Sequence, residues 1–320
     1  MSTAGIAWIA AGECDGRSGP RPAPGANTTT SAPAPAGQVS APGGVRSDGM
    51  PAGRWGAPST LGLPLDDRGL LLADGLFETV LLEGGRPQLL APHLQRWRRS
   101  AALLGLAPPP SEGAVRALLA EAMARSGIGT GALRLNWSRG GGSRGLDPPE
   151  PGGERFWLQL SPWSPQFTPV SAIVSPTERR CASSLLSRCK SFAYGSAIQA
   201  RRQAHAAGAE EALLESTAGG LCCAAAANLL LHDGERWLTP PLTSGCLAGV
   251  MRQRALDQGV AREALQPIAP EALQGGGIDR ALLINSLGCR PLRRCDGRPL
   301  NPPSPAEAEA LWRALLDPSD

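Results

Sequence analysis

One side-chain amine stands out in this chain of 320 residues. Lys190 is the only lysine among 31 basic residues, and the others are all arginines. An amine can lose its proton and attack a carbonyl to form a Schiff base, whereas a guanidinium group stays protonated. Lys190 is therefore a candidate for covalent chemistry, although the composition is equally consistent with the chance survival of one lysine.

A second group of residues can bind an anion. Gly249 precedes a predicted helix, so the backbone N–H groups of Val250 and Met251 can point at a phosphate. Arg96 adds a fork of donors, and Ser286 adds a hydroxyl group. Taken one by one, these residues also fit ordinary roles: a turn glycine, a surface arginine and a strand-end cap.

Two further arginines flank a run of four small residues. Because Arg139 and Arg144 enclose this run, both guanidinium groups can approach one concavity. Such a pair suits a substrate with more than one carboxylate. The alternative is a glycine hairpin with two solvated arginines.

The composition argues against several classes of protein. The net charge is only +3 and no basic stripe is visible, so we expect no nucleic-acid partner. No apolar run reaches the roughly 18 residues that a membrane helix needs. The eight cysteines form no CxxC pair, which favours reduced thiols over a zinc site or a disulfide framework. We therefore expect a cytoplasmic protein.

Strands and helices alternate along the chain and must position these residues. The patterns predict strands at 70–72, 77–82, 133–137, 156–160, 172–174, 212–214, 228–231 and 281–285, and helices at 91–105, 111–126, 194–207, 249–256 and 306–316. This order predicts two mixed α/β or α+β domains. We divide the chain into a first-strand segment (1–15), a disordered Pro/Ala/Gly-rich insertion (16–60), a small α/β domain (61–163) and a larger domain (164–320). Residues 17–60 contain no Leu, Ile or Phe, which is the reason for predicting disorder.

Several segments, in this order, resemble the class IV pyridoxal-phosphate enzymes. These are Asp67-Arg68-Gly69 with Asp74–Thr79, His93–Arg96, Lys190–Tyr194, Ala226–Leu229 with Thr239-Pro240-Pro241, Gly249–Arg252 and Asn285–Leu287. Any one of them is a weak signal, but together they cover about residues 61–300.

The resemblance implies a two-domain α/β fold, fold type IV, with pyridoxal 5'-phosphate in the cleft between the domains. It implies that Lys190 forms the Schiff base with the cofactor, and that Arg96, Val250, Met251 and Ser286 bind its phosphate. It also places Asn228 on a strand that contacts the cofactor. The family's homodimers imply a homodimer here.

Tyr194, the only tyrosine, lies four residues after Lys190. If this segment is helical, the two side chains share one face, and the phenol can bind the ring oxygen of the cofactor. Packing in the core is the alternative role.

One position departs from the family. Counting back from Asn228, the family's glutamate, which keeps the pyridine nitrogen protonated, falls on Cys223, whose thiol is a poorer partner. Aligning on the cysteine pair would place Leu221 there instead. Ala193 also replaces an asparagine that is usual in the family.

Within the family, Arg139, Arg144 and the sequence around Gly249 are most similar to 4-amino-4-deoxychorismate lyases. The first hypothesis is therefore a lyase that makes 4-aminobenzoate and pyruvate for folate synthesis. The second is an aminotransferase for branched-chain or D-amino acids. The third is a non-catalytic relative that binds the cofactor or only dimerises.

Overall fold

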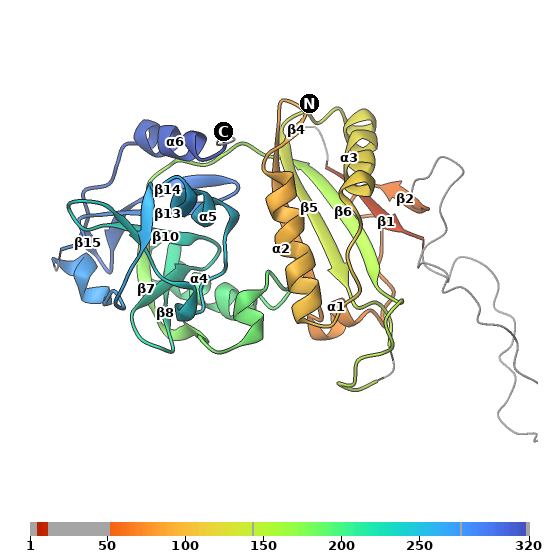
Figure 1. The fold of residues 1–320 in the computed structure, drawn as a ribbon, viewed down its shortest axis with the longest axis horizontal. Helices are drawn as coiled ribbons and strands as arrows, with labels where there is room; N and C mark the ends of the chain where they lie inside the picture. Colours follow the sequence, from red (N-terminus) through yellow and green to blue (C-terminus); the bar gives the residue numbers. More distant parts are fainter. Residues whose placement is uncertain (1–4, 12–51, 143, 276, 318–320) are drawn as a thin grey trace, which may run out of the picture.

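Two β-sheets, each with its own helices, lie side by side in the computed structural model (Figure 1). The structure describes residues 5–11, 52–142, 144–275 and 277–317. Among the helices in these ranges, none is long and apolar enough to cross a membrane.

The first sheet has six strands in the order β2-β1-β6-β5-β3-β4 and is antiparallel throughout. Its strands are β1 (Ile6–Ala10), β2 (Gly53–Gly56), β3 (Gly75–Glu83), β4 (Arg86–Pro87), β5 (Gly131–Ser138) and β6 (Arg155–Pro162). The helices in this half are α1 (Arg68–Leu72), α2 (Leu90–Leu103) and α3 (Glu112–Ser126).

Alternation along β3 and β5 gives this sheet two different faces. Successive side chains of a strand point to opposite faces. Leu76, Val80 and Leu133 belong to the core cluster that also contains Trp97 of α2 and Leu118 of α3. Phe77 and Thr79 of β3 and Arg134 of β5 fall on the opposite face, which is turned toward the second half of the molecule.

The second sheet has nine strands, eight of them in the order β12-β11-β10-β13-β14-β7-β8-β9, with β15 paired to β14. Its strands are β7 (Val170–Arg180), β8 (Glu211–Ser216), β9 (Leu221–Ala224), β10 (Asn228–His232), β11 (Trp237–Thr239), β12 (Ala261–Glu263), β13 (Arg280–Asn285), β14 (Gly288–Cys295) and β15 (Arg298–Pro299). Strand β7 pairs in parallel with both β8 and β14, so the sheet is mixed.

Three α-helices and three short 3-10 helices complete this half. They are α4 (Gly195–Ala206), α5 (Val250–Asp257), α6 (Pro305–Ala314), η1 (Leu185–Arg188), η2 (Leu242–Ser244) and η3 (Pro270–Gln274). Helix α6 begins with a capping box in which Ser304 and Glu307 satisfy each other's backbone N–H groups. Its Trp312 is fully buried in a cluster with residues of α5, β13 and β14.

Two sequence predictions were wrong in this part of the structure. Residues Gly53–Gly56, assigned to the disordered insertion, form β2 and pair with β1, where Trp55 lies opposite Trp8. The rest of the predicted insertion, up to residue 51, lies outside the described residues. The predicted strand at 70–72 is helical, because Asp67 caps a helix start by accepting a hydrogen bond from the backbone N–H of Gly69.

Candidate active site

A cavity of about 890 Å³ lies where the two sheets meet, and residues of both sheets line it. Eight of the ten predicted site residues line this cavity: Arg96, Lys190, Tyr194, Cys223, Asn228, Val250, Met251 and Ser286. The other two, Arg139 and Arg144, do not. The structure therefore brings together residues that are up to 190 positions apart in the sequence.

Lys190 is held in the cavity by backbone pairing with β3. The N–H of Phe77 donates to the carbonyl of Lys190 at 2.9 Å, and the N–H of Phe192 donates to the carbonyl of Gly75 at 3.0 Å. These bonds attach the Lys190 segment to the start of β3 as a short added strand. In sequence, Lys190 belongs to the second half of the chain. In space, its backbone is held by hydrogen bonds to a strand of the first sheet.

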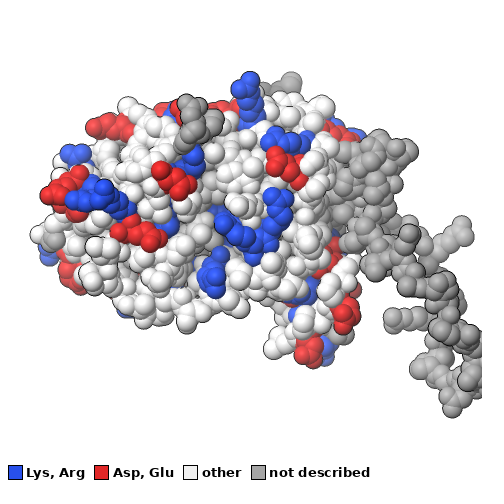
Figure 2. Space-filling view, viewed as in Figure 1, with Lys and Arg blue, Asp and Glu red and all other residues white. Residues whose placement is uncertain are grey.

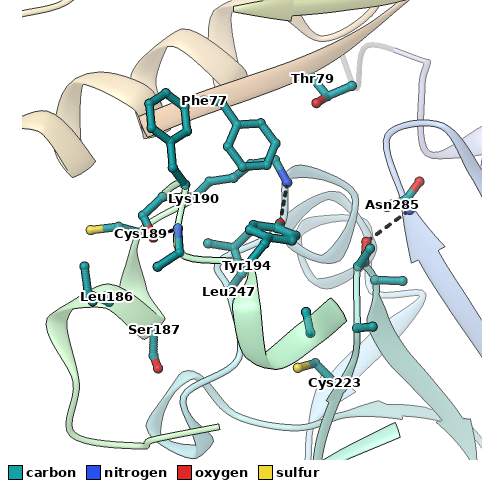
Figure 3. A pocket seen from close by; sticks show the side chains of 18 of the residues that line it. Phe77, Thr79, Leu186, Ser187, Cys189, Lys190, Tyr194, Cys223, Leu247 and Asn285 are labelled. Carbon is teal, nitrogen blue, oxygen red and sulfur yellow. Dashed lines mark hydrogen bonds between the residues drawn. The ribbon is translucent and has the colours of Figure 1, made fainter. Parts of the chain in front are cut away.

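The Lys190 amine has an aromatic surrounding. Its Nζ donates to the Tyr194 hydroxyl at 3.2 Å and lies 4.4 Å from the centre of the Phe77 ring (Figure 3). Helix α4 begins at Gly195, so Lys190 and Tyr194 both lie before it. The prediction that they share one face of a helix was therefore wrong. Their contact comes from the turn that leads into α4.

The N-terminus of α5 provides a place for an anion. Gly249, Val250 and Met251 line the cavity, and the first N–H groups of a helix have no acceptor within it. No side chain caps this helix end. A Cβ atom at Gly249 would lie 1.9 Å from Oδ1 of Asn228, so only glycine fits this approach. Asn228 in turn donates to the carbonyl of Leu247 at 2.9 Å and holds the turn in place.

A buried polar network stands behind this helix end. Glu78 accepts hydrogen bonds from Arg96 at 2.8 and 2.6 Å and lies 2.7 Å from Nδ1 of His93. Nε2 of His93 lies 3.0 Å from the Ser286 hydroxyl. Arg96 also donates to the carbonyl of Ala248, directly before the anion site. The sequence had marked Glu78 and His93 only as members of family motifs.

The charge states within this network follow from its contacts. Burial raises the pKa of Glu78, but attraction to Arg96 and hydrogen bonds from Arg96 and His93 outweigh it and lower that pKa to about 2. Burial lowers the pKa of His93, and Glu78 only partly offsets this. The Glu78 carboxylate can only accept a hydrogen bond, so a neutral His93 carries its proton on Nδ1 and donates it to Glu78. Nε2 of His93 then accepts a hydrogen bond from the Ser286 hydroxyl. Ser286 is thus oriented by the pair behind it.

Cys223 lies on the cavity wall at β9, below Lys190 and Tyr194 in the view of Figure 3. It pairs with Leu214 of β8, which also lines the cavity. Leu221, the alternative position for the family's glutamate, does not line it. The structure therefore favours Cys223 as the residue that faces the ligand.

The prediction that Arg139 binds substrate was wrong for this pocket. Its Nε donates to Asp74 at 2.7 Å, and its two remaining nitrogens donate to the carbonyls of Gly105 and Leu104 at 2.9 and 2.8 Å. The guanidinium group is thus used to tie β5 to the end of α2. Arg144 is exposed and does not line the cavity, so its role in substrate binding stays a prediction.

Sequence reasoning missed three arginines that do line the cavity: Arg134, Arg179 and Arg180. Arg134 lies on β5 with its guanidinium 3.7 Å from the centre of the Phe77 ring, and its Nε donates to Asn136. Arg180, at the end of β7, donates to the carbonyls of Gly245 and Ser187. Among the described residues, neither Arg134 nor Arg180 forms an ion pair with a carboxylate. The polar residues 134 and 136 alternate with Leu133 and Leu135, which was the available signal for Arg134.

The cavity is more basic than the rest of the molecule. Figure 2 shows acidic and basic side chains mixed over one face of the described protein. In contrast, no Asp or Glu of the described residues lines the cavity, whereas five basic side chains do: Arg96, Arg134, Arg179, Arg180 and Lys190. Arg179 pairs with Glu215 outside it. The site therefore suits a ligand with several negative charges.

Comparisons with known proteins agree with this site. Residues 75–295 match the family described as "Amino-transferase class IV". The "Putative branched-chain-amino-acid aminotransferase" of Methanocaldococcus jannaschii is 28% identical over 188 residues, which are 58% of this chain and 65% of that protein. The "Putative aminodeoxychorismate lyase" of Schizosaccharomyces pombe is 30% identical over 215 residues, which are 66% of this chain and 85% of that protein.

A solved structure has the same fold. The "Putative 4-amino-4-deoxychorismate lyase" from Legionella pneumophila superposes with a TM-score of 0.72 and 27% identity, covering 81% of this chain and 96% of that one. Across the first curated relatives, the matched parts span only 26–65% of those proteins.

The chain belongs to the class IV aminotransferase family. It is a pyridoxal 5'-phosphate enzyme with the mixed α/β fold of type IV, as the motifs predicted. The residues fit the cofactor: Lys190 would supply an amine for its aldehyde, and the uncapped α5 N-terminus would supply backbone N–H donors for its phosphate, with Arg96 and Ser286 also lining the cavity. The matched family makes this an enzyme, so the third hypothesis is set aside, and its relatives include both lyases and aminotransferases.

Proposed function

We propose that this enzyme is a 4-amino-4-deoxychorismate lyase, which forms 4-aminobenzoate and pyruvate. The observation that carries the proposal is the pair Arg134 and Arg180. Both line the cavity, and within the described residues neither has a carboxylate partner. The proposed substrate carries two carboxylates, one on its ring and one on its enolpyruvyl group, so each arginine has a counter-charge to bind.

The partial burial of Arg134 strengthens this argument. Arg134 is half-buried, and this burial lowers its pKa. A partly buried charge of this kind is stabilised by an anion. As amino donors, branched-chain amino acids and D-alanine carry one carboxylate each, so they would leave one of the two arginines without a counter-charge. The acceptor 2-oxoglutarate carries two carboxylates and would engage both, so the argument separates the lyase substrate from the amino donors alone.

Within the reaction, the bound cofactor supplies an aldehyde that takes up the substrate amine and a ring that withdraws electrons. The proton transfers are carried out by residues of the chain. The Lys190 amine, released from the cofactor by the substrate, takes the proton from the amino-bearing carbon. Lys190 then returns a proton to the departing enolpyruvyl group, which leaves as pyruvate. The Tyr194 hydroxyl, 3.2 Å from Nζ, orients the amine for both transfers.

The test is a direct comparison of two activities in the purified enzyme loaded with cofactor. Formation of 4-aminobenzoate from 4-amino-4-deoxychorismate is measured beside amino-group transfer from branched-chain amino acids and from D-alanine to 2-oxoglutarate. We expect the lyase reaction to dominate. Brisk transfer without formation of 4-aminobenzoate would identify an aminotransferase instead.

Variants of Arg134 and Arg180 test whether these two arginines bind the substrate. We expect Arg134→Gln and Arg180→Gln each to lower kcat/KM for the lyase substrate by at least tenfold, because each loses a charge-assisted bond of about 1.5–3 kcal/mol. Arg116→Gln is the matched control, since this arginine is exposed on α3 and pairs only with Glu112. Unchanged kinetics in both pocket variants would remove the argument for a substrate with two carboxylates.

A further inference from the structure

The described residues that line the cavity offer no carboxylate to the cofactor's ring. Pyridoxal phosphate contains a pyridine nitrogen, and an anionic neighbour is what stabilises the protonated form of such a base. Among the described residues that line the cavity, the groups that can carry charge or titrate are the five basic side chains together with Tyr194, Cys181, Cys189 and Cys223. None of these is a carboxylate. The environment therefore opposes a positive charge on the ring.

The chemistry of the cofactor selects the wall that the nitrogen faces. On the pyridine ring, the nitrogen lies directly across from the carbon that carries the aldehyde. With its aldehyde at Lys190 and its phosphate arm at the α5 N-terminus, the cofactor would point its ring nitrogen away from Lys190. Figure 3 shows Cys223 below Lys190 and Tyr194, on the part of the cavity wall formed by β9. This is also the position at which the family resemblance expects a glutamate.

Strand geometry separates the two neighbouring cysteines. Along β9 successive side chains point to opposite faces, so Cys222 and Cys223 cannot both enter the cavity. Cys222 is turned toward η2, where its thiol donates to the carbonyl of Ser244 at 3.3 Å. Cys223 is the one that lines the cavity, and its side chain is 7% exposed.

The surroundings keep this thiol uncharged. The adjacent Cys222 and burial raise the pKa of Cys223 well above its usual value, and the nearby Arg180 only partly opposes this. The other neighbouring titratable group, Cys246, acts in the same direction as burial. A neutral thiol can donate a weak hydrogen bond to a nitrogen lone pair, but it cannot supply the negative charge that a pyridinium needs.

We infer that Cys223 presents a neutral thiol to the pyridine nitrogen and that the ring nitrogen of the bound cofactor carries no proton. This deepens the proposed function and rests, like it, on pyridoxal phosphate occupying the cavity. An unprotonated ring withdraws electrons less strongly, so it favours reactions in which a leaving group carries the electrons away. Elimination of pyruvate with formation of an aromatic ring is such a reaction. Transfer of the amino group to a keto acid depends more on the ring and is disfavoured.

The test measures the protonation state of the ring nitrogen directly. The enzyme is loaded with cofactor enriched in ¹⁵N at the ring, and the ¹⁵N resonance is recorded from pH 6 to pH 9. We expect the resonance of an unprotonated pyridine across this range, both in the wild type and in Cys223→Ser. In Cys223→Glu we expect it to move toward the position of a pyridinium ion. A pyridinium resonance in the wild type would overturn the inference, whether or not the glutamate variant folds.

A cofactor analogue gives a second and independent measurement. When the ring nitrogen is replaced by a C–H group, we expect turnover of the wild type to fall by less than tenfold, because that nitrogen is not used in its protonated form. A loss of more than a hundredfold would contradict the inference.

The two proposals fail separately. An unprotonated resonance in a protein that forms no 4-aminobenzoate would leave the inference standing and remove the lyase assignment. A pyridinium resonance in an active lyase would do the reverse.

Discussion

Replacing Glu78 is the most stringent test of how much the buried network contributes to stability. Its side chain is completely buried, and it accepts three hydrogen bonds from Arg96 and His93. A lowering of its pKa from 4.5 to about 2 corresponds to about 3 kcal/mol of folding free energy, since a tenfold change in a protonation equilibrium is worth about 1.4 kcal/mol. Replacing it by glutamine leaves the buried Arg96 without its partner. We therefore expect Glu78→Gln to lower the free energy of unfolding at pH 7 by about 3–5 kcal/mol.

The pH dependence of this loss has a definite sign. The folded state lowers the pKa of Glu78, so its contribution is fully present above pH 4.5 and is lost as the pH falls toward 2. The difference between wild type and Glu78→Gln should therefore be constant from pH 7 to pH 5 and should shrink below pH 4.5. Urea unfolding of both proteins, without cofactor, measures it at each pH.

A surface pair provides the control for this prediction. Glu121 pairs with Arg125 on the exposed side of α3, and Glu121→Gln should cost no more than about 0.5 kcal/mol at any pH. Two results would refute the reasoning: a loss below about 1 kcal/mol in Glu78→Gln, or a loss of several kcal/mol that does not change between pH 5 and pH 3. The first would mean that the network adds little to stability, and the second that the effect does not come from the carboxylate's charge.

Two further predictions concern cofactor binding. Borohydride reduction of the loaded enzyme followed by peptide mapping should place the pyridoxyl group on Lys190, and Lys190→Arg should carry no label; a label on the N-terminal amine in the wild type would contradict this. Gly249→Ala should weaken the affinity for pyridoxal phosphate at least tenfold, because its Cβ would lie 1.9 Å from Oδ1 of Asn228. Gly195→Ala, where an added Cβ meets no atom within 4 Å, should keep the wild-type affinity, and equal affinities in the two variants would show that the turn before α5 has room for a side chain.

Local sequence was sufficient for much of the fold. The helix at 111–126 could be predicted because Ser111 caps its start and Gly127 ends it with a positive φ angle, and both signals lie within the segment itself. The strand at 70–72 was mistaken because three leucines carry no period, so the capping contact of Asp67 was decisive there. The end of the insertion was misplaced because β2 has only four residues and is formed by pairing with β1.

The sequence by itself determined the candidate residue for covalent attachment of the cofactor and the family motifs around it. Lys190 could be singled out because no other side chain in the chain has its chemistry, and the motifs around Arg96 and Gly249 depend on residues close together in the sequence. Only the tertiary structure decided which arginines face the ligand. Thirty guanidinium groups are alike in sequence, and their roles depend on what they meet in space.

The contrast between two arginines five residues apart shows the physical reason. Arg139 spends its donors on Asp74 and on the end of α2, whereas Arg134 projects from the other face of β5 into the cavity. The same alternation separates Cys222 from Cys223. A strand's sequence fixes which side chains share a face, but the partner packed on each face comes from distant parts of the chain, and that partner decides whether a face meets core, solvent or ligand.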